Sequence, residues 1–301
     1  MNGWARSLRD RWEIRLGERE YPSALLELQR PPEVIRGVGN PESLLTLGLG
    51  IVGSRRASPY GCAICKMAGR VAAECGVRVI SGGAMGCDFE AGMAAYEAGG
   101  STIVVAGTGA DVPYPDSSLP VFEAACESGG AVISMERWGQ GPRRYAFPRR
   151  NSVVAALSHV VLVAEAGHRS GTMSTAEAAV ELGRELYAVP GSIFSPLSAG
   201  TNRLAAEGAR IIPDAASLEM AIAFDFGSAR MVQETPRRSL GPVMSALVAC
   251  PSRIDELSRA LGEDVLTVLK TLTDLEARGL VQRLPDGRYS PTDTFLLGQN
   301  S

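Results

Sequence analysis

The sequence predicts an α/β fold, in which a doubly wound, Rossmann-like parallel sheet is followed by a small C-terminal winged-helix domain. Three observations lead to this prediction. Short apolar, β-branched runs alternate with alanine-rich helical runs from about residue 45 to 213, this periodicity is lost over residues 226–243, and residues 244–292 then form a compact unit. Apolar strands separated by helices are typical of a parallel sheet that is covered on both faces.

Seven short runs are predicted to be the strands of that sheet, because each is apolar and nearly continuous. They are Leu47–Val52, Val77–Ser81, Ile103–Ala106, Val132–Ser134, His159–Val163, Leu186–Val189 and Arg210–Ile212. The helical runs between them include Cys62–Cys75, Phe89–Ala98, Leu119–Glu127 and Thr175–Leu182. We therefore expect a Rossmann-like domain over residues 45–225, preceded by a lead-in segment over residues 1–44.

The C-terminal part is predicted to be a linker, a winged helix and a tail. Residues 226–243 are rich in Gly, Ser, Pro and mixed charge, which is typical of a linker. Within residues 244–292 we expect three helices and a two-stranded wing, which is the pattern of a winged helix, and residues 293–301 remain as a tail. The predicted elements are Met244–Ala249, Ser252–Leu261, Val265–Arg278, and a hairpin of Leu280–Leu284 and Arg288–Ser290 around Asp286-Gly287.

The charge of the winged-helix module bears on its role. Residues 244–292 hold six Lys or Arg and seven Asp or Glu. A domain that reads duplex DNA normally has a basic surface. The composition therefore favours a protein-contact or regulatory module, with a duplex-DNA regulator as the alternative.

The overall composition is that of a soluble globular protein, with 45% hydrophobic and 21% charged residues. The N-terminus is too charged for a secretory signal, and no apolar run approaches the length of a membrane span. We therefore expect a cytoplasmic protein with no membrane partner. The six cysteines lack metal-like spacing and the chain has two histidines, so neither a metal site nor a cofactor is expected.

Several of the turns that follow the predicted strands have the composition of anion-binding loops. In an open parallel sheet, ligands bind beyond the carboxyl ends of the strands. Glycines there bring backbone N–H groups to a helix N-terminus, which favours phosphate. The candidate phosphate-binding residues are Gly53, Ser54, Arg55, Arg56, Gly82, Gly83, Ser170, Gly171 and Thr172. No strict dinucleotide or P-loop pattern is present, so a dinucleotide or ATP is not expected.

A basic and aromatic segment lies between the fourth and fifth predicted strands. Five arginines fall within residues 137–150, with Trp138, Tyr145 and Phe147 among them and no Asp or Glu, although the chain carries a net charge of −3. Such a segment suits a phosphate backbone and stacked bases, and a solvated surface loop is the alternative. The candidate contacts are Arg143, Arg144, Phe147, Arg149, Arg150 and Asn151, and we favour Arg149 and Arg150.

A set of ordered motifs resembles the DNA-processing protein A family (DprA, also called Smf) over about residues 20–292. The lead-in motifs are Tyr21-Pro22, Pro31-Pro32 and Gly39-Asn40, and the glycine-rich motifs include Ile51–Arg55 and Ile80–Ala84 with Asp88. Further motifs are Phe147–Asn151, Ser170–Thr172, Gly183–Glu185, Val189–Ser192 and Gly200–Leu204. The chain departs from the family pattern at Met85, Cys87, Gly92 and Ser152.

The resemblance implies a non-enzymatic protein that binds and protects incoming single-stranded DNA and loads the RecA recombinase onto it during natural transformation. It also implies a homodimer formed through the Rossmann-like domain. Carried over by motif, Arg55 and residues 147–151 would contact the DNA strand.

The alternative function is a nucleotide-processing enzyme similar to the nucleoside-monophosphate phosphoribohydrolases. Those enzymes use a Pro-Gly-Gly-x-Gly-Thr-x-x-Glu loop with a catalytic Glu. Here Glu177 follows Thr172 by five residues instead of three, and the Pro-Gly-Gly is absent. The chain also lacks a nucleophile elbow and paired carboxylates at a strand end. We therefore predict no catalytic residues and expect the protein not to be an enzyme.

Overall fold

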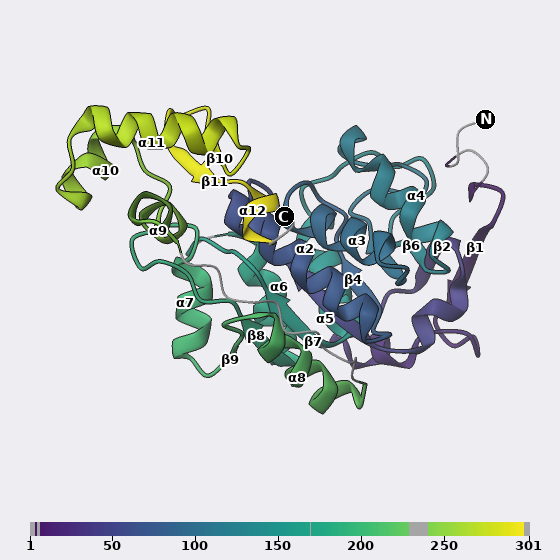
Figure 1. Ribbon diagram of the computed structural model, residues 1–301. Helices are drawn as coiled ribbons and strands as arrows, with labels where there is room; N and C mark the ends of the chain where they lie inside the picture. Colours follow the sequence, from purple (N-terminus) through teal and green to yellow (C-terminus); the bar gives the residue numbers. More distant parts are fainter. Residues whose placement is uncertain (1–3, 5–6, 169, 229–239, 298–301) are drawn as a thin grey trace.

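A computed structural model describes residue 4 and residues 7–168, 170–228 and 240–297, and it confirms the α/β prediction (Figure 1). The described residues form one large sheet whose strand order is β1-β2-β6-β5-β4-β3-β7-β8-β9. The strands are β1 (Arg11–Arg15), β2 (Val34–Gly39), β3 (Gly48–Val52), β4 (Val79–Ser81), β5 (Thr102–Val105), β6 (Ala131–Ser134), β7 (Ser158–Val163), β8 (Glu185–Ala188) and β9 (Arg210–Ile211).

The strands β3 to β9 are parallel, and each overlaps one of the seven predicted runs. Their side chains alternate between the two faces of the sheet. Leu49 and Ile51 of β3 pack on one face, whereas Val52 packs on the other. The predicted second strand begins two residues too early, because Val77 closes the preceding helix by donating its N–H to the carbonyl of Ala72 at 2.8 Å.

The sheet also contains two strands that the sequence did not predict. Residues 1–44, expected as a separate lead-in segment, supply β1 and β2, which extend the sheet beyond β6 in antiparallel pairing. Trp12 of β1 lies over Gly37 and donates its indole N–H to the carbonyl of Gly39 at 2.8 Å. β1 is the edge strand and alternates charged and apolar residues, as is usual at an exposed edge. β2 lies between β1 and β6, and its apolar residues are interrupted by Arg36 and Gly37.

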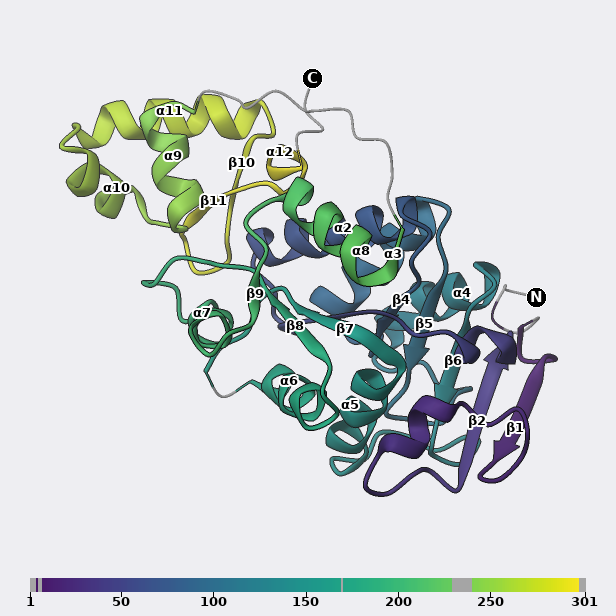
Figure 2. The same ribbon diagram turned by 90° about the horizontal axis from the view of Figure 1, so that it is seen from below.

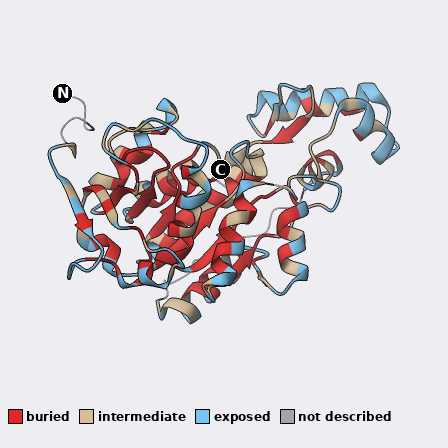
Figure 3. Ribbon diagram, turned by 180° about the vertical axis from the view of Figure 1, so that it is seen from behind, coloured by how far each residue is buried: buried red, intermediate tan, exposed pale blue. Residues whose placement is uncertain are grey.

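Helices cover both faces of the sheet, as a doubly wound fold requires. Figures 1 and 2 show α2, α3, α4 and α8 on one face and α5 and α6 on the other. Figure 3 shows that the sheet between them is buried. The helices are α2 (Pro59–Glu74), α3 (Cys87–Glu97), α4 (Leu119–Glu127), α5 (Ala146–Leu157), α6 (Gly171–Glu181), α7 (Ala199–Ala206) and α8 (Ala215–Phe226), with 3-10 turns η1 (Ser23–Glu27), η2 (Pro41–Leu45) and η3 (Asp116–Ser118).

Helix α5 changes the interpretation of the arginine-rich segment. Its first half contains Phe147, Arg149 and Arg150, so these residues lie on a helix and not in a loop. Pro148 is compatible with this helix because it occupies the first turn, where backbone N–H groups have no partner within the helix.

The C-terminal module has the elements of a winged helix and a small core of its own around Leu247, Leu257 and Leu272. Its elements are α9 (Pro242–Ala249), α10 (Ile254–Leu261), α11 (Val265–Ala277), β10 (Val281–Arg283) and β11 (Tyr289–Pro291). Residues 229–239 of the expected linker lie outside the described residues.

Part of the expected tail is structured. Residues Asp293–Leu296 form α12, which packs against α2 (Figure 1). There Lys66 of α2 donates a hydrogen bond to the carboxylate of Asp293. This contact attaches the winged helix to the Rossmann-like domain. Among the described residues, no helix is long and apolar enough to cross a membrane.

Candidate nucleic-acid interface

The loops at the carboxyl edge of the parallel strands are bonded to one another. Thr172 Oγ1 donates to the carbonyl of Gly53 at 2.9 Å, and the N–H of Ser54 donates to the carbonyl of Glu165 at 2.8 Å. Asn151 Nδ2 donates to Ser174 Oγ at 2.7 Å and to the carbonyl of Gly171 at 3.1 Å. Several hydroxyl and amide groups selected as ligands therefore already hold the loops in place.

A pocket of about 250 Å³, called here the edge pocket, opens at the ends of β3, β4 and β5. It is lined by Arg55, Arg56, Gly82, Ala84, Met85, Ala106, Gly107, Thr108, Tyr114, Pro115, Phe122, Phe147 and Arg150. Its walls thus combine aromatic rings, small residues and three guanidinium groups.

Aromatic side chains and Arg55 form one wall of the edge pocket. The Phe147 ring lies against Gly107, where an added Cβ would come within 2.8 Å of the ring. The centres of the Phe147 and Tyr114 rings are 6.2 Å apart. The exposed Arg55 places its Cζ 4.8 Å from the centre of the Phe147 ring. This arrangement offers a flat surface for a base beside a cation for a phosphate.

The floor of the edge pocket is a buried ion pair. Arg150 Nη1 lies 3.5 Å from Asp88 Oδ2, which also accepts the N–H of Gly82 at 3.0 Å. An added Cβ on Gly82 would lie 1.2 Å from Arg150 Nη1, so a larger residue there would displace the guanidinium group. Arg150 therefore occupies the space that Gly82 was predicted to leave for a phosphate.

Burial sets the ionisation of this pair. It raises the pKa of the Asp88 carboxyl, and the neighbouring Arg150 guanidinium opposes that shift. Burial also lowers the pKa of Arg150, and the nearby charge of Arg55 acts in the same direction. Among the described residues Arg150 Nε has no hydrogen-bond partner.

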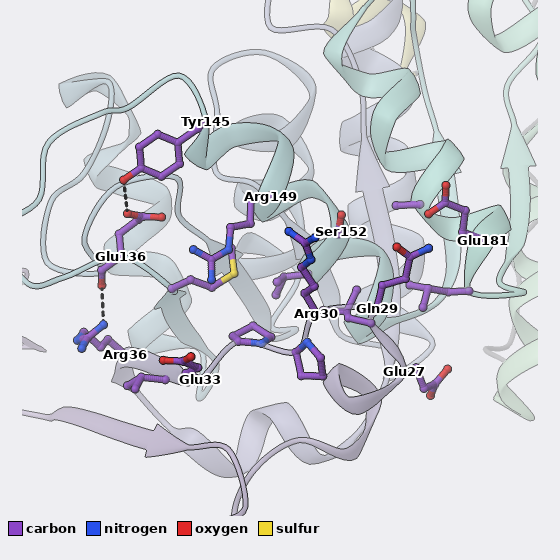
Figure 4. Close-up of a pocket in the computed structure, with 18 of the residues that line it drawn as sticks. Glu27, Gln29, Arg30, Glu33, Arg36, Glu136, Tyr145, Arg149, Ser152 and Glu181 are labelled. Atoms are coloured by element: carbon purple, nitrogen blue, oxygen red, sulfur yellow. Dashed lines mark hydrogen bonds between the residues drawn. The ribbon is translucent and has the colours of Figure 1, made fainter.

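Arg149 lies elsewhere, in a groove of about 1350 Å³ between α5, the segment before β2 and the end of α6 (Figure 4). Figure 4 shows Arg149 and Arg30 entering this α5 groove from opposite walls. Consecutive helix residues point about 100° apart, so the two arginines favoured together from the sequence reach separate sites. Ser152 also lines the α5 groove.

The α5 groove has mixed charge. Glu136 is buried on its wall and accepts a hydrogen bond from Tyr145 at 3.2 Å. Arg36 donates to the carbonyl of Glu136 at 3.3 Å and pairs with Glu13 at 2.8 Å. The arginines in this groove are Arg30, Arg36, Arg137 and Arg149, and the glutamates are Glu27, Glu33, Glu136 and Glu181.

The rest of the arginine-rich segment is dispersed. Arg143 and Arg144 are exposed and line neither the edge pocket nor the α5 groove. Trp138 is held against β1, since its indole N–H donates to Glu13 at 2.9 Å and Arg11 lies 4.9 Å from its ring.

Two other predicted loop sites, Gly83 and Ser170-Gly171, differ in their surroundings. Gly83 has a φ of +62°, which favours glycine, and an added Cβ would meet Val104 at 2.6 Å. Ser170 and Gly171 form the start of α6, and Ser170 Oγ has no hydrogen-bond partner among the described residues. The neighbouring Arg169 lies outside the described residues.

Three features of this edge were not selected from the sequence. Met85 and Tyr114 line the edge pocket. Glu165 is buried and accepts hydrogen bonds from the backbone and hydroxyl of Ser58 at the start of α2, and burial raises the pKa of this carboxyl. Tyr114 could have been found, because it is an aromatic residue shortly after a predicted strand.

Family models match most of the chain. The model described as DNA recombination-mediator protein A matches residues 13–222, and the DprA winged helix domain matches residues 229–287. Protein Smf of Escherichia coli is 31% identical over 279 residues, which cover 89% of this chain and 74% of that protein. The DNA processing protein DprA of Streptococcus pneumoniae is 38% identical over 196 residues, covering 64% of this chain and 67% of that protein.

Solved structures agree with these matches. The X-ray structure of DprA from Streptococcus pneumoniae has a TM-score of 0.65 and 33% identity, covering 71% of this chain and 75% of that chain. The DprA structure from Helicobacter pylori, reported for its single-stranded DNA binding mode, has a TM-score of 0.64 and 30% identity, covering 71% and 96%. The chain therefore belongs to the DNA recombination-mediator protein A family, the DprA/Smf proteins.

Proposed function

We propose that this protein binds single-stranded DNA without catalysing a reaction on it, protects incoming DNA, and loads RecA recombinase during natural transformation or DNA uptake. The observation that carries the DNA-binding proposal is the edge pocket, where Arg55 stands over the Phe147 ring beside Tyr114. The related Helicobacter pylori protein, with its single-stranded DNA binding mode, supports the same ligand.

In the proposed complex, Arg55 and Arg56 hold phosphates and one base lies against Phe147 and Tyr114. The Asp88–Arg150 pair acts as a rigid floor, because both side chains are already neutralised by each other. Stacking and phosphate contacts make the binding tolerant of sequence and sensitive to salt. The RecA and transformation roles rest on family membership, and we place the protein in the cytoplasm, where both DNA and recombinase would be reached.

We propose that a homodimer forms at the opposite side of the sheet from β1. Ile211 of β9 is 52% exposed, and Met220 and Phe224 of α8 are 68% and 79% exposed. An apolar patch at a sheet edge is typical of a protein interface. Mass photometry should detect a dimer, and Phe224→Ser should shift it toward the monomer.

The DNA-binding proposal is tested by fluorescence anisotropy with a labelled oligo-dT of about 20 nucleotides. We expect tight binding at low salt that weakens as salt rises, and weaker binding by Arg55→Ala. A wild-type protein that leaves the oligonucleotide free at low salt would overturn the proposal.

The same assay addresses the winged helix. Its acidic character predicts that a variant lacking residues 240–301 keeps most of its affinity for oligo-dT. Complete loss of binding by a truncated protein that is still folded would favour the duplex-DNA regulator.

The phosphoribohydrolase alternative gains no support from the site. Glu177, its candidate catalytic acid, is exposed on α6 and is not among the residues that line the edge pocket. Release of free base from a nucleoside monophosphate would be the observation that revives it.

A further inference from the structure

The loop between β8 and α7, residues 189–198, carries the two most exposed large hydrophobic side chains of the described residues. Ile193 and Phe194 are both 83% exposed. An isolated exposed apolar residue is ordinary in a soluble protein. Two adjacent ones, including an aromatic ring, at the carboxyl edge of the sheet need a further explanation.

The exposure of this pair is maintained by a well-bonded loop. Asn202 binds both the N–H and the carbonyl of Gly191, at 3.1 and 3.0 Å. Tyr60 of α2 donates to the carbonyl of Pro190 at 2.7 Å, and an added Cβ on Gly191 would lie 2.2 Å from Ser198 Oγ. These contacts hold the backbone of the loop in place, and Phe194 projects from it into solvent.

This loop continues the edge that carries the edge pocket. The N–H of Gly200 donates to the carbonyl of Ala166 at 2.8 Å, which joins the loop to the one after β7. That loop is joined in turn to Gly53 through Thr172. The loop itself, residues 189–198, contains no Asp or Glu, and the carboxylate of the nearby Glu207 is paired with Arg203 at 2.7 Å.

We propose that Phe194, supported by Ile193, is a second stacking site for an unpaired nucleobase of the bound strand. The proposal rests on the proposed function. Four strand spacings separate the end of β5, under Phe147, from the end of β8, which is about 20 Å along the edge. One strand reaches both rings only if it is several nucleotides long.

Oligonucleotide length therefore separates the two sites. Phe194→Ala should weaken binding of an oligo-dT of about 20 nucleotides by about 5- to 150-fold, the loss expected for one stacked base. Binding of a thymidine dinucleotide, which is too short to span about 20 Å, should stay unchanged. The variant should fold normally, because Phe194 is exposed, and thermal unfolding checks this.

Two further variants identify the kind of contact. Phe194→Leu should behave like Phe194→Ala if the ring stacks on a base, because leucine keeps the apolar surface and loses the π-face. Phe194→Trp should keep the affinity, and its added fluorescence should be quenched as oligo-dT binds, relative to the wild type.

The outcomes separate this site from the proposed function. If the wild type binds, Arg55→Ala binds poorly and all Phe194 variants match the wild type without quenching, the second site is wrong and the function stands. If Phe194→Ala instead alters the mass of the protein in solution and leaves DNA affinity intact, the loop is an interface between copies. If the wild type fails to bind oligo-dT, both proposals are overturned.

Discussion

Arg149 and Arg150 are neighbours in the same motif, yet they lie in different regions of the molecule. Arg150 is 4% exposed and pairs with Asp88 under the edge pocket, whereas Arg149 is exposed in the α5 groove. One step along a helix turns the side chain by about 100°. A motif therefore shows where two arginines occur in the sequence. The orientation of α5 determines that Arg150 lies under the edge pocket and that Arg149 lines a separate groove.

The two regions also differ in charge. In the edge pocket Arg150 is neutralised by Asp88, but Arg55 and Arg56 have no carboxylate beside them on the pocket lining. The α5 groove has four arginines and four glutamates on its lining. Phosphates are attracted where positive charge is not compensated. We therefore expect the strand to follow the edge pocket, although the groove is larger.

Replacing Arg150 and Arg149 with alanine, one at a time, should give the largest difference between the two regions, and it is a difference in the free energy of unfolding. Arg150→Ala leaves the Asp88 carboxylate buried without its partner, which should lower the free energy of unfolding by about 3–5 kcal/mol. Arg149→Ala removes an exposed side chain and should change it by no more than about 0.5 kcal/mol. Urea denaturation measures both values.

A double variant separates the ion pair from general packing. Asp88→Asn together with Arg150→Ala should be less destabilised than the sum of the single changes, because no unpaired charge remains. Strict additivity would mean that the two side chains do not interact.

Replacing an aromatic residue of the edge pocket or of the α5 groove should give the next largest difference, in affinity for DNA. Phe147→Ala should weaken oligo-dT binding by about 1–3 kcal/mol because one stacked base is lost. Tyr145→Ala is the matched control, since Tyr145 is 60% exposed and lines the α5 groove. An equal loss for Tyr145→Ala would place the strand in the groove instead of the edge pocket.

The salt dependence of binding compares the arginines directly. If Arg55 neutralises one phosphate, Arg55→Ala should reduce the slope of log K against log salt by about 0.7. Arg149→Ala should leave the slope unchanged, because the glutamates of its groove compensate its charge. A reduced slope for Arg149→Ala in anisotropy titrations would show that the strand enters both regions.

The sequence predicted the parallel part of the fold well, because β3 to β8 are almost entirely buried and their apolar runs are nearly continuous. It missed β1, whose residues Arg11–Arg15 alternate between charged and apolar at an exposed edge. It also located the candidate loops but not the edge pocket, whose walls come from the connections after β3, β4, β5 and β6. Which residues meet there depends on strand order and helix rotation, and neither is contained in a local motif.

The smallest expected effect concerns Glu165, which connects the loop after β7 to the start of α2. Burial raises the pKa of this carboxyl above its ordinary value of 4.5, although hydrogen bonds from Ser58 oppose the shift. The folded protein therefore holds this proton more tightly than the unfolded chain, and the contribution of Glu165 to stability is lost as pH rises from about the unfolded pKa through the folded pKa. Glu165→Gln keeps an oxygen that can accept a hydrogen bond from Ser58, but the side chain cannot ionise. The free energy of unfolding of this variant should therefore vary less with pH in that window. Urea denaturation at a series of pH values measures this. A variant with the same pH dependence as the wild type would mean that Glu165 titrates alike in both states.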